Sequence, residues 1–264
     1  METLSSDSRK RIALGKRFRS LPSFQCLGVN PNWEDYSQGE MRDMEEAGTI
    51  YYPSSLYEDF FLSLGKKVFP RNYYRFMGNK IRQTNLFQLL DIRHPRTRLY
   101  YGRNPLAQIL ADFRLPFIGK TSLGSSKGKG VFLIKEEAQL ENYLRTHRPA
   151  YIQEYLPVDR DLRVVVLAGK AVHAYWRIQR PGEFRNNVFQ GATISFADIP
   201  PEAVEFAEDV ARRCRFDEVG LDICVFEGEC YAIEANMVFG LEGFKQAGLD
   251  LPEVFADLER HGLL

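Results

Sequence analysis

Apolar and polar positions follow two rhythms along this chain, one typical of amphipathic helices and one of half-buried strands. The helical rhythm predicts helices over residues 39–46, 56–64, 80–90, 104–113, 136–145 and 202–214. The strand rhythm predicts strands over 11–14, 49–52, 117–120, 131–134 and 151–155, and hairpins over 162–177 and 220–236. In the helix over 104–113 we expect Asn104 as N-cap and Pro105 at the first position. Together these elements predict an α+β protein with a short α/β layer in its first 75 residues.

The second predicted hairpin brings three oxygen-bearing side chains together. Glu234 and Asn236 lie two positions apart in one strand, so both side chains leave on the same face. With a three-residue loop over 227–229, Asp222 on the partner strand lies opposite Glu234. The hairpin before it is expected to turn at Gly169 and Lys170.

Hard cations such as Mg²⁺ prefer carboxylate and amide oxygens, which Asp222, Glu234 and Asn236 would supply. The alternative is a solvent-facing polar side of an ordinary hairpin. The neighbouring residues in both strands are apolar, and no Lys or Thr interrupts the acidic row. We therefore favour the metal interpretation.

A glycine-rich loop over residues 124–130 joins two predicted strands. Glycines allow backbone N–H groups to approach phosphate oxygens, and lysines add positive charge. The loop lacks the Walker spacing, and a strand follows it where a Rossmann loop has a helix. It is therefore expected to cover phosphates from above, with Lys120 reaching them from the preceding strand. The alternative is a simple hairpin connection.

Two further polar segments indicate a functional site only when they are taken together with the hairpin and the glycine-rich loop. The first runs Gln153-Glu154-Tyr155-Leu156 and is followed by Asp159, Asp161 and Arg163. The second, over residues 183–187, follows Arg177 and Arg180 and is rich in Arg and Asn. Guanidinium groups bind phosphate or carboxylate with two parallel hydrogen bonds, which suits anion recognition. An ordinary charged loop is the alternative for this second segment.

Composition narrows the class of protein. The 264 residues include 35 basic and 35 acidic ones, and a general nucleic-acid binder is normally basic. A basic stretch over residues 9–19 is interpreted as a solvated face, with a wall for an acidic substrate as the alternative. No apolar run suggests a membrane span or a signal peptide. The four cysteines lack paired metal-ligand spacing, so we expect reduced thiols in a cytoplasmic protein.

In this order, these features resemble the ATP-grasp superfamily, and most closely its RimK-type glutamate ligase branch. The resemblance covers residues 78–245. It is carried by Asn79-Lys80, Lys120 with the glycine-rich loop, Gln153-Glu154-Tyr155, Asp161-Leu162-Arg163, Phe184-Arg185-Asn186-Asn187, Gly220-Leu221-Asp222, and Glu234-Ala235-Asn236 followed by Gly240-Leu241-Glu242-Gly243. It implies an ATP-grasp fold, in which two α+β subdomains grip ATP. The implied divisions are a pre-ATP-grasp region over 1–75, a central subdomain over 76–152 and a C-terminal subdomain over 153–264.

The resemblance also assigns residue roles. The nucleotide-binding set would comprise Lys80, Lys120, Gly124, Ser125, Gly128, Gly130, Gln153, Glu154, Tyr155, Leu156 and Asp161. In this set the two lysines contact phosphates, and Glu154 with the following backbone forms the adenine-binding hinge. Asp222, Glu234 and Asn236 would bind two Mg²⁺ (or Mn²⁺) ions. Arg185 would neutralise the transferring phosphate, and Arg163 and Asn187 would line the phosphate and substrate region.

The implied activity is an ATP-dependent ligase that forms C–N bonds and releases ADP and phosphate. Its substrates would be a small-molecule carboxylate and an amine that is free or part of a protein. Neither nucleic acid nor a membrane is expected as a partner. A homo-oligomer is compatible with these features. The alternatives are an ATP-grasp kinase and a non-catalytic nucleotide-binding regulator. The chain departs from the family in a glycine-rich loop one residue longer and in Met237-Val238-Phe239-Gly240, where the family has Ser-Pro-Gly. Glutamate is therefore not carried over as substrate.

Overall fold

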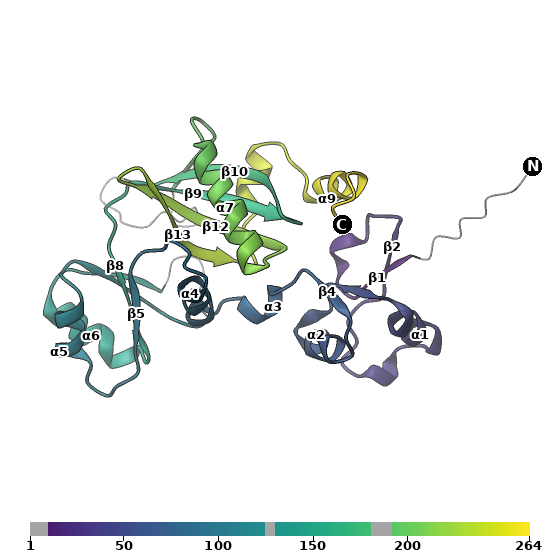
Figure 1. Cartoon of the computed structure of the whole chain (residues 1–264), viewed down its shortest axis with the longest axis horizontal. Coiled ribbons are helices and arrows are strands. Elements are labelled where there is room, and N and C mark those ends of the chain that lie inside the picture. The colour runs from purple at the N-terminus through teal and green to yellow at the C-terminus, as the bar shows by residue number, and fades with distance from the viewer. Residues whose placement is uncertain (1–9, 125–129, 181–191) are drawn as a thin grey trace, which may run out of the picture. The chain divides into compact units, whose positions relative to one another are not determined.

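The computed structural model describes residues 10–124, 130–180 and 192–264 (Figure 1). The chain forms two compact units, one of residues 1–74 with 244–264 and one of residues 75–243. Helices and sheets occur in both, which confirms the predicted α+β class. The division at residues 75 and 152 stays a prediction.

The first unit is built on a parallel sheet. Its strands, in the order β2-β1-β3-β4, are β2 (Phe24–Cys26), β1 (Arg11–Ala13), β3 (Thr49–Tyr51) and β4 (Lys67–Phe69). Its helices are the 3₁₀ turns η1 (Lys16–Phe18) and η2 (Trp33–Asp35), then α1 (Gln38–Glu46), α2 (Ser54–Ser63) and α9 (Leu251–Arg260). The alternation of parallel strands and helices confirms the α/β layer expected there.

Both faces of this parallel sheet are covered by apolar side chains. Met44 of α1 and Tyr57 of α2 pack in one buried cluster with Ile50 of β3. On the other face, the Phe18 ring lies 5.1 Å from the Phe255 ring of α9, centroid to centroid. Short parallel strands are stable only when buried on both sides, and this arrangement meets that need.

The second unit contains an antiparallel sheet of order β5-β8-β6-β7. Its strands are β5 (Thr97–Tyr100), β6 (Phe117–Lys120), β7 (Val131–Ile134) and β8 (Ala150–Glu154), and it packs against α5 (Leu106–Asp112) and α6 (Glu137–Thr146). The bounds of β6 and β7 match the prediction at both ends. The predicted cap on α5 is wrong, because Pro105 occupies the cap position without a side-chain hydrogen bond.

A second antiparallel sheet has the order β11-β10-β9-β12-β13. Its strands are β9 (Arg160–Leu167), β10 (Lys170–Ile178), β11 (Thr193–Ser195), β12 (Glu218–Phe226) and β13 (Glu229–Asn236). Helix α7 (Pro201–Cys214) crosses this sheet in Figure 1 and buries a stripe of small side chains that includes Ala207 and Ala211. The opposite face carries the charged residues described below.

Both hairpins of this sheet close with two-residue turns. Ala168 and Gly169 have φ of 49° and 81°, and Glu227 and Gly228 have φ of 52° and 80°. Two successive positive φ values match the right-handed twist of antiparallel strands. The predicted turn at Gly169 and Lys170 and the predicted three-residue loop over 227–229 are therefore wrong by one residue.

Three more helices complete the described elements: α3 (Tyr73–Phe76), α4 (Lys80–Leu89) and α8 (Glu242–Gln246). Asn79 caps α4, because its Oδ1 accepts a hydrogen bond from the Arg82 amide at 3.0 Å. The four cysteines are free thiols. Within the described ranges, no helix is both long and apolar enough to cross a membrane.

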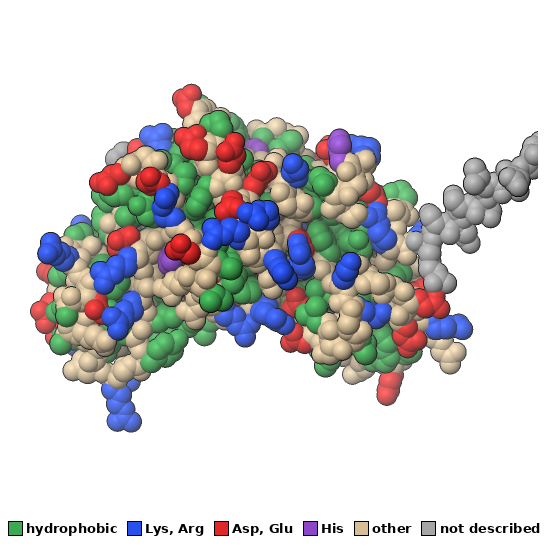
Figure 2. Space-filling view, in the orientation of Figure 1, with side chains coloured by type: hydrophobic (Ala, Val, Ile, Leu, Met, Phe, Trp, Pro, Cys, Tyr) green, Lys and Arg blue, Asp and Glu red, His purple; other side chains and the backbone are tan. Residues whose placement is uncertain are grey.

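Charged side chains are mixed over the surface. On the face drawn in Figure 2, acidic and basic groups of the described residues are interspersed, with apolar side chains between them. The equal numbers of acidic and basic residues agree with this mixture.

Candidate active site

The predicted metal residues lie where β12 pairs with β13. Asp222 is directly opposite Glu234, and Gly220 is opposite Asn236. The pairing arises differently from the way we predicted it. The shorter turn pairs Phe226 with Glu229, and an irregularity between Asp222 and Ile223 then adds one residue to β13. This β-bulge restores the predicted partners, and such bulges commonly re-aim side chains beside functional sites.

Two buried arginines hold Asp222. Arg163 Nε lies 2.5 Å from Asp222 Oδ1, and Arg177 Nη2 lies 2.9 Å from Oδ2. The Asn236 amide donates to Oδ2 at 3.2 Å. Burial raises the pKa of Asp222, but the two guanidinium groups outweigh burial and hold it below its ordinary value. Asp222 is therefore a carboxylate at neutral pH.

Arg177 also binds Asp161 through two parallel hydrogen bonds of 2.7 Å each. The two residues are directly opposite in the pairing of β9 with β10. Burial raises the pKa of Asp161, while Arg177 lowers it in part. Burial lowers the pKa of Arg177, but Asp161 and Asp222 together hold it above its ordinary value. Arg177 thus bridges two carboxylates, a role that our sequence analysis missed.

Helix α4 presents three buried polar side chains, Lys80, Gln83 and Thr84. Lys80 Nζ lies 2.7 Å from Glu234 Oε1, which joins a predicted phosphate ligand to a predicted metal ligand. The Thr84 hydroxyl lies 2.7 Å from the Tyr151 hydroxyl of β8. The helix therefore contacts both sheets of the second unit.

Lys120 is the last residue of β6 and is only 4% exposed. Burial lowers the pKa of its ammonium group to about 8, against the opposing effect of the Glu234 carboxylate. Its Nζ lies 5.9 Å from the centre of the Tyr151 ring. Within the described ranges, no hydrogen bond or ion pair of Lys120 Nζ is present. A cation in this setting is suited to an anionic ligand.

The ends of the glycine-rich loop are tied to this cluster. The Thr121 amide donates to the Gly130 carbonyl at 2.8 Å, and the Lys80 amide donates to the Ser122 carbonyl at 3.1 Å. Gly124 has a φ of 67° and donates to the Gly78 carbonyl at 3.2 Å. The predicted residues Ser125, Gly128, Arg185 and Asn187 lie outside the described residues.

The predicted adenine hinge connects β8 to β9. Gln153 is buried and donates from Nε2 to Thr97 Oγ1 at 2.9 Å. Glu154 exchanges two hydrogen bonds with Arg96, whose amide donates to Glu154 Oε1 at 2.8 Å and whose carbonyl accepts from the Glu154 amide at 2.9 Å. Tyr155 and Leu156 follow in the connecting segment and are half-buried.

The donor chemistry of Asp222, Glu234 and Asn236 fits a hard divalent cation. All three offer oxygen, and the strand register places them on one face of the hairpin. Among the described residues, no three His, Cys, Asp or Glu side chains lie close enough together to hold a metal ion. A cation bound at Asp222 and Glu234 would therefore need the side-chain oxygen of Asn236 as a third protein ligand. Lys80, Arg163 and Arg177 neutralise the carboxylates in this structure.

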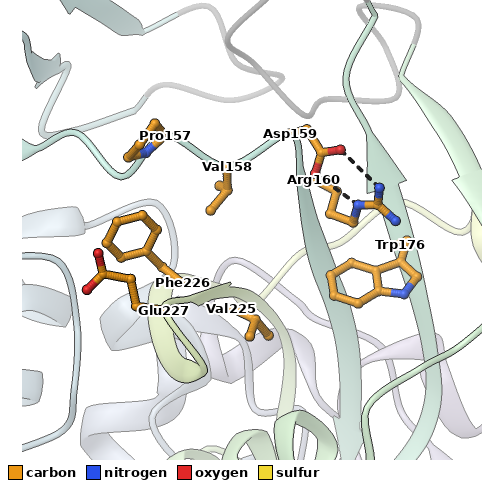
Figure 3. A pocket seen from close by; sticks show the side chains of 8 residues that line it. All are labelled: Pro157, Val158, Asp159, Arg160, Trp176, Val225, Phe226 and Glu227. Atoms are coloured by element: carbon orange, nitrogen blue, oxygen red, sulfur yellow. Dashed lines mark hydrogen bonds and ion pairs between the residues drawn. The ribbon is translucent and has the colours of Figure 1, made fainter.

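A separate pocket of about 420 Å³ lies between the segment that leads into β9 and the turn of the β12–β13 hairpin (Figure 3). Trp176 and Arg160 line it, and strand alternation turns both away from the face of Asp161 and Arg177. Its other lining residues are Pro157, Val158, Asp159, Val225, Phe226 and Glu227. The predicted site residues that the structure describes all lie elsewhere.

The segment after Asn236 lies against the charged face. A Cβ added to Gly220 would come within 2.9 Å of Phe239 Cβ and 3.2 Å of Arg163 Cδ. A Cβ on Gly243 would come within 2.2 Å of the Tyr175 ring. Phe239 and Tyr175 therefore border the carboxylate cluster, and neither was a predicted site residue.

Two sheets, a glycine-rich connection between β6 and β7, and a charged β12–β13 hairpin define an ATP-grasp type of protein. The model of the RimK-like ATP-grasp domain matches residues 77–258, more than half of the chain. The chain therefore belongs to the RimK-like ATP-grasp family.

Curated relatives match part of the chain. A protein of Aeromonas salmonicida named "Probable alpha-L-glutamate ligase" is 32% identical over 131 residues, which cover 47% of this chain and 44% of that protein. The coenzyme gamma-F420-2:alpha-L-glutamate ligase of Methanocaldococcus jannaschii is 26% identical over 189 residues, covering 68% and 65%. The matched regions thus span less than two thirds of these relatives.

Solved structures show the same fold. A RimK domain ATP-grasp protein from Sphaerobacter thermophilus has a TM-score of 0.67 at 16% identity, covering 94% of this chain and 98% of that one. The ATP-grasp ligase PsnB, complexed with precursor peptide and AMPPNP, has a TM-score of 0.57 at 15% identity, covering 81% and 77%. These likenesses confirm the predicted ATP-grasp fold.

Proposed function

We propose that this chain is an ATP-dependent carboxylate–amine ligase that works through an acyl phosphate. One observation carries the proposal: Lys80, Lys120 and Arg163 converge, within a RimK-like ATP-grasp domain, on the face that carries Asp222 and Glu234. The names of the curated relatives, which are ligases, support it.

In the proposed reaction, a carboxylate oxygen attacks the γ-phosphorus of ATP, and ADP leaves. The amine then attacks the acyl carbon, the bond from that carbon to the phosphate oxygen breaks, and the amine releases a proton. The products are an amide, ADP and phosphate. The first step spreads negative charge over the transferring group, so cations placed beforehand lower its barrier.

The residues take the following roles in the proposal. Lys80 and Lys120 bind the phosphates, with Gly124 and Gly130 at the ends of the glycine-rich loop. The segment from Gln153 to Leu156 holds the adenine. Asp222, Glu234 and Asn236 hold Mg²⁺, which when bound offsets phosphate charge and aligns the phosphates. Arg163, Arg185 and Asn187 stabilise the transferring phosphate, and Asp161 positions Arg177.

The charge pairs of this structure suit that role. Lys80 neutralises Glu234, while Arg163 and Arg177 neutralise Asp222, so the buried carboxylates are compensated before any ligand binds. A nucleotide phosphate would take the place of a carboxylate beside Lys80 or Arg163, and a divalent cation would compensate the carboxylate so released. Each ligand would therefore favour binding of the other.

The substrate is proposed only as a class, a carboxylate with an amine acceptor that is free or part of a peptide. PsnB was solved with a precursor peptide, which makes peptides a necessary part of the search. Phe239, in the segment where the family pattern has Ser-Pro-Gly, lies beside the cluster together with Tyr175 of β10. An acceptor with an apolar or aromatic part would pack against them.

A substrate screen tests the proposal. The full chain, ATP and Mg²⁺ are incubated with amino acids, small dicarboxylates and short peptides, and ADP and phosphate are measured. Mass analysis then identifies the product. We expect a condensed amide together with one phosphate for each ADP. A stable phosphorylated compound without free phosphate would instead establish a kinase, and binding of ATP without turnover on any substrate would indicate a regulator.

A further inference from the structure

Strand β13 is the edge of its sheet, yet the backbone of Ala235 is hydrogen-bonded on the outer side. Gln83 Nε2 donates to the Ala235 carbonyl at 2.6 Å, and the Ala235 amide donates to Gln83 Oε1 at 3.2 Å. A single carboxamide thus makes the pair of bonds that a neighbouring strand would make. Among side chains only Asn and Gln offer an adjacent donor and acceptor of this kind.

The position of this contact along β13 is informative. The irregular pairing between Asp222 and Ile223 puts the extra residue of β13 immediately before Glu234. A β-bulge interrupts the ladder locally and lets the strand bend, and pairing with β12 resumes at Glu234 and continues to Asn236. Gln83 bonds the strand one residue past Glu234, just after the interruption of the ladder.

Ala235 lies between the two predicted metal ligands of β13. Side chains alternate along a strand, so Glu234 and Asn236 point to one face while the peptide groups of Ala235 lie between them. Fixing the amide and the carbonyl of Ala235 fixes the planes of both adjoining peptides. The directions of the Glu234 and Asn236 side chains are thereby fixed as well.

Gln83 is itself rigidly held. Its side chain is 3% exposed, and Nε2 also donates to the Phe76 carbonyl at 3.1 Å. On the same helix, one turn earlier, Lys80 contacts Glu234, and the next residue, Thr84, contacts Tyr151. A buried amide that lost these partners would cost free energy, so the rotamer of Gln83 is well defined.

We propose that Gln83 is a positioning residue that sets the geometry of the cation site by holding Ala235 between Glu234 and Asn236. The proposal rests on the proposed function only in assigning cation binding to this hairpin. Supporting hydrogen bonds of this kind change metal affinity by about 10- to 100-fold when removed. Gln83 needs no contact with nucleotide or substrate for this role.

The test compares the full-length wild type with Gln83→Met and Gln83→Glu. Methionine keeps the shape and loses both bonds, whereas glutamate keeps the acceptor for the Ala235 amide and loses the donor to its carbonyl. Gln88→Met is the matched control, because Gln88 lies on the same helix and, among the described residues, its side chain donates to the Thr97 carbonyl at 3.0 Å and not to β13. Binding of Mn²⁺ is followed by electron paramagnetic resonance with the non-hydrolysable analogue AMPPNP present, and AMPPNP binding is repeated in EDTA.

We expect Gln83→Met to weaken Mn²⁺ binding about 10-fold or more, with AMPPNP affinity in EDTA unchanged. Gln83→Glu should weaken it as well, because its carboxylate would face the Ala235 and Phe76 carbonyl oxygens. Gln88→Met should bind Mn²⁺ as wild type does. Equal Mn²⁺ affinity in Gln83→Met and Gln88→Met would overturn the role of Gln83 and leave the proposed ligase intact. A wild type that binds AMPPNP but no Mn²⁺ would overturn both.

A measurement on the unmodified chain covers the case in which both variants fail to fold. If Gln83 accepts the Ala235 amide proton, that amide exchanges with solvent deuterium as slowly as amides inside the β9–β12 pairing. Exchange as fast as that of the turn residue Gly228 would refute the proposal.

Discussion

Replacing Arg177 by methionine probes the buried charge network directly. Arg177 binds Asp161 twice and Asp222 once, and its side chain is 10% exposed. Methionine has a similar length and no charge, so the variant leaves Asp161 buried without its guanidinium partner. Removing one partner of a buried ion pair costs about 3–5 kcal/mol in the free energy of unfolding. For a chain of this size, the thermal midpoint should fall by about 10 °C.

The loss should depend on pH in a defined direction. Burial already raises the pKa of Asp161, and without Arg177 that pKa rises further. The folded variant then binds more protons than the unfolded chain at pH values above the unfolded pKa of Asp, about 3.9. Its stability therefore falls as pH rises, and the difference from wild type is smaller at pH 5 than at pH 8.

Urea unfolding at pH 5 and pH 8, in EDTA, measures this difference. The control is Arg160→Met on the neighbouring strand β9, because Arg160 is exposed and pairs with the exposed Asp159. That pair should contribute less than about 1 kcal/mol at either pH. A loss in Arg177→Met that equals the control, or that is the same at both pH values, would refute the reasoning.

Three further predictions concern the site. In the wild type, ATP affinity should fall between pH 7 and 9, because the Lys120 ammonium, with a pKa of about 8, loses its proton. Lys120→Met should weaken ATP binding and abolish this pH dependence. Calorimetric titration across this range measures both effects, and wild-type affinity in the variant would contradict the assignment of Lys120 to the phosphates. Asp222→Asn should retain the fold, checked by circular dichroism, and lose ATP turnover, so wild-type ADP release would exclude a metal role. Gly243→Ala should cost about 1–3 kcal/mol, because its Cβ would lie 2.2 Å from the Tyr175 ring. Gly39→Ala, whose Cβ meets nothing closer than 3.9 Å, should keep or slightly raise the thermal midpoint, because alanine favours a helix over glycine. Equal midpoints for the two variants would contradict the packing argument.

Much of the second unit was predictable because its strands are short apolar runs bounded by glycine or charged residues. Strand β6 is buried along its whole length and β7 is apolar throughout, and the bounds of both were predicted correctly. In the first unit, β2 and β4 have three residues each and were missed. A three-residue strand in a parallel sheet is too short to show a period, and its partners are distant in sequence.

The pairing of Asp222 with Glu234 was predicted correctly through two errors that cancel. The loop was taken one residue too long, and the bulge in β13 restores the register. Sequence contains no direct signal for such a bulge. It depends on how the edge of β13 meets Gln83 and the Arg93 carbonyl, which accepts from the Ala232 amide at 2.9 Å.

The contact between Arg177 and Asp161 was not predicted, because the predicted turn set the wrong register between β9 and β10. A turn at Gly169 and Lys170 places Arg177 opposite Leu162, an apolar neighbour. The observed register places it opposite Asp161. Strand register decides which charges meet, and a shift of one residue moves a side chain to the other face. The sequence shows neither the positive φ of Ala168, which moves the turn by one residue, nor the irregularity between Ala171 and His173, without which Arg177 would lie opposite Arg160.

The contact of Gln83 with Ala235 could not be predicted from the sequence, for a different reason. Its position in α4 follows from helical periodicity, which places it one turn after Lys80. Its partner, the Ala235 backbone, is 152 positions away in the chain. A side chain that bonds backbone leaves no complementary residue type at the other end, so no pattern in a single sequence can reveal the contact.

Transfer of a carboxyl oxygen from the substrate to the released phosphate tests ligation through an acyl phosphate directly. The carboxylate substrate found in the screen is labelled with ¹⁸O in its carboxyl group and incubated with the full chain, ATP, Mg²⁺ and the amine. Transfer through an acyl phosphate predicts one labelled oxygen in each phosphate released, one in the amide product and none in ADP. Unlabelled phosphate, or a phosphorylated compound that accumulates without an amide, would contradict it.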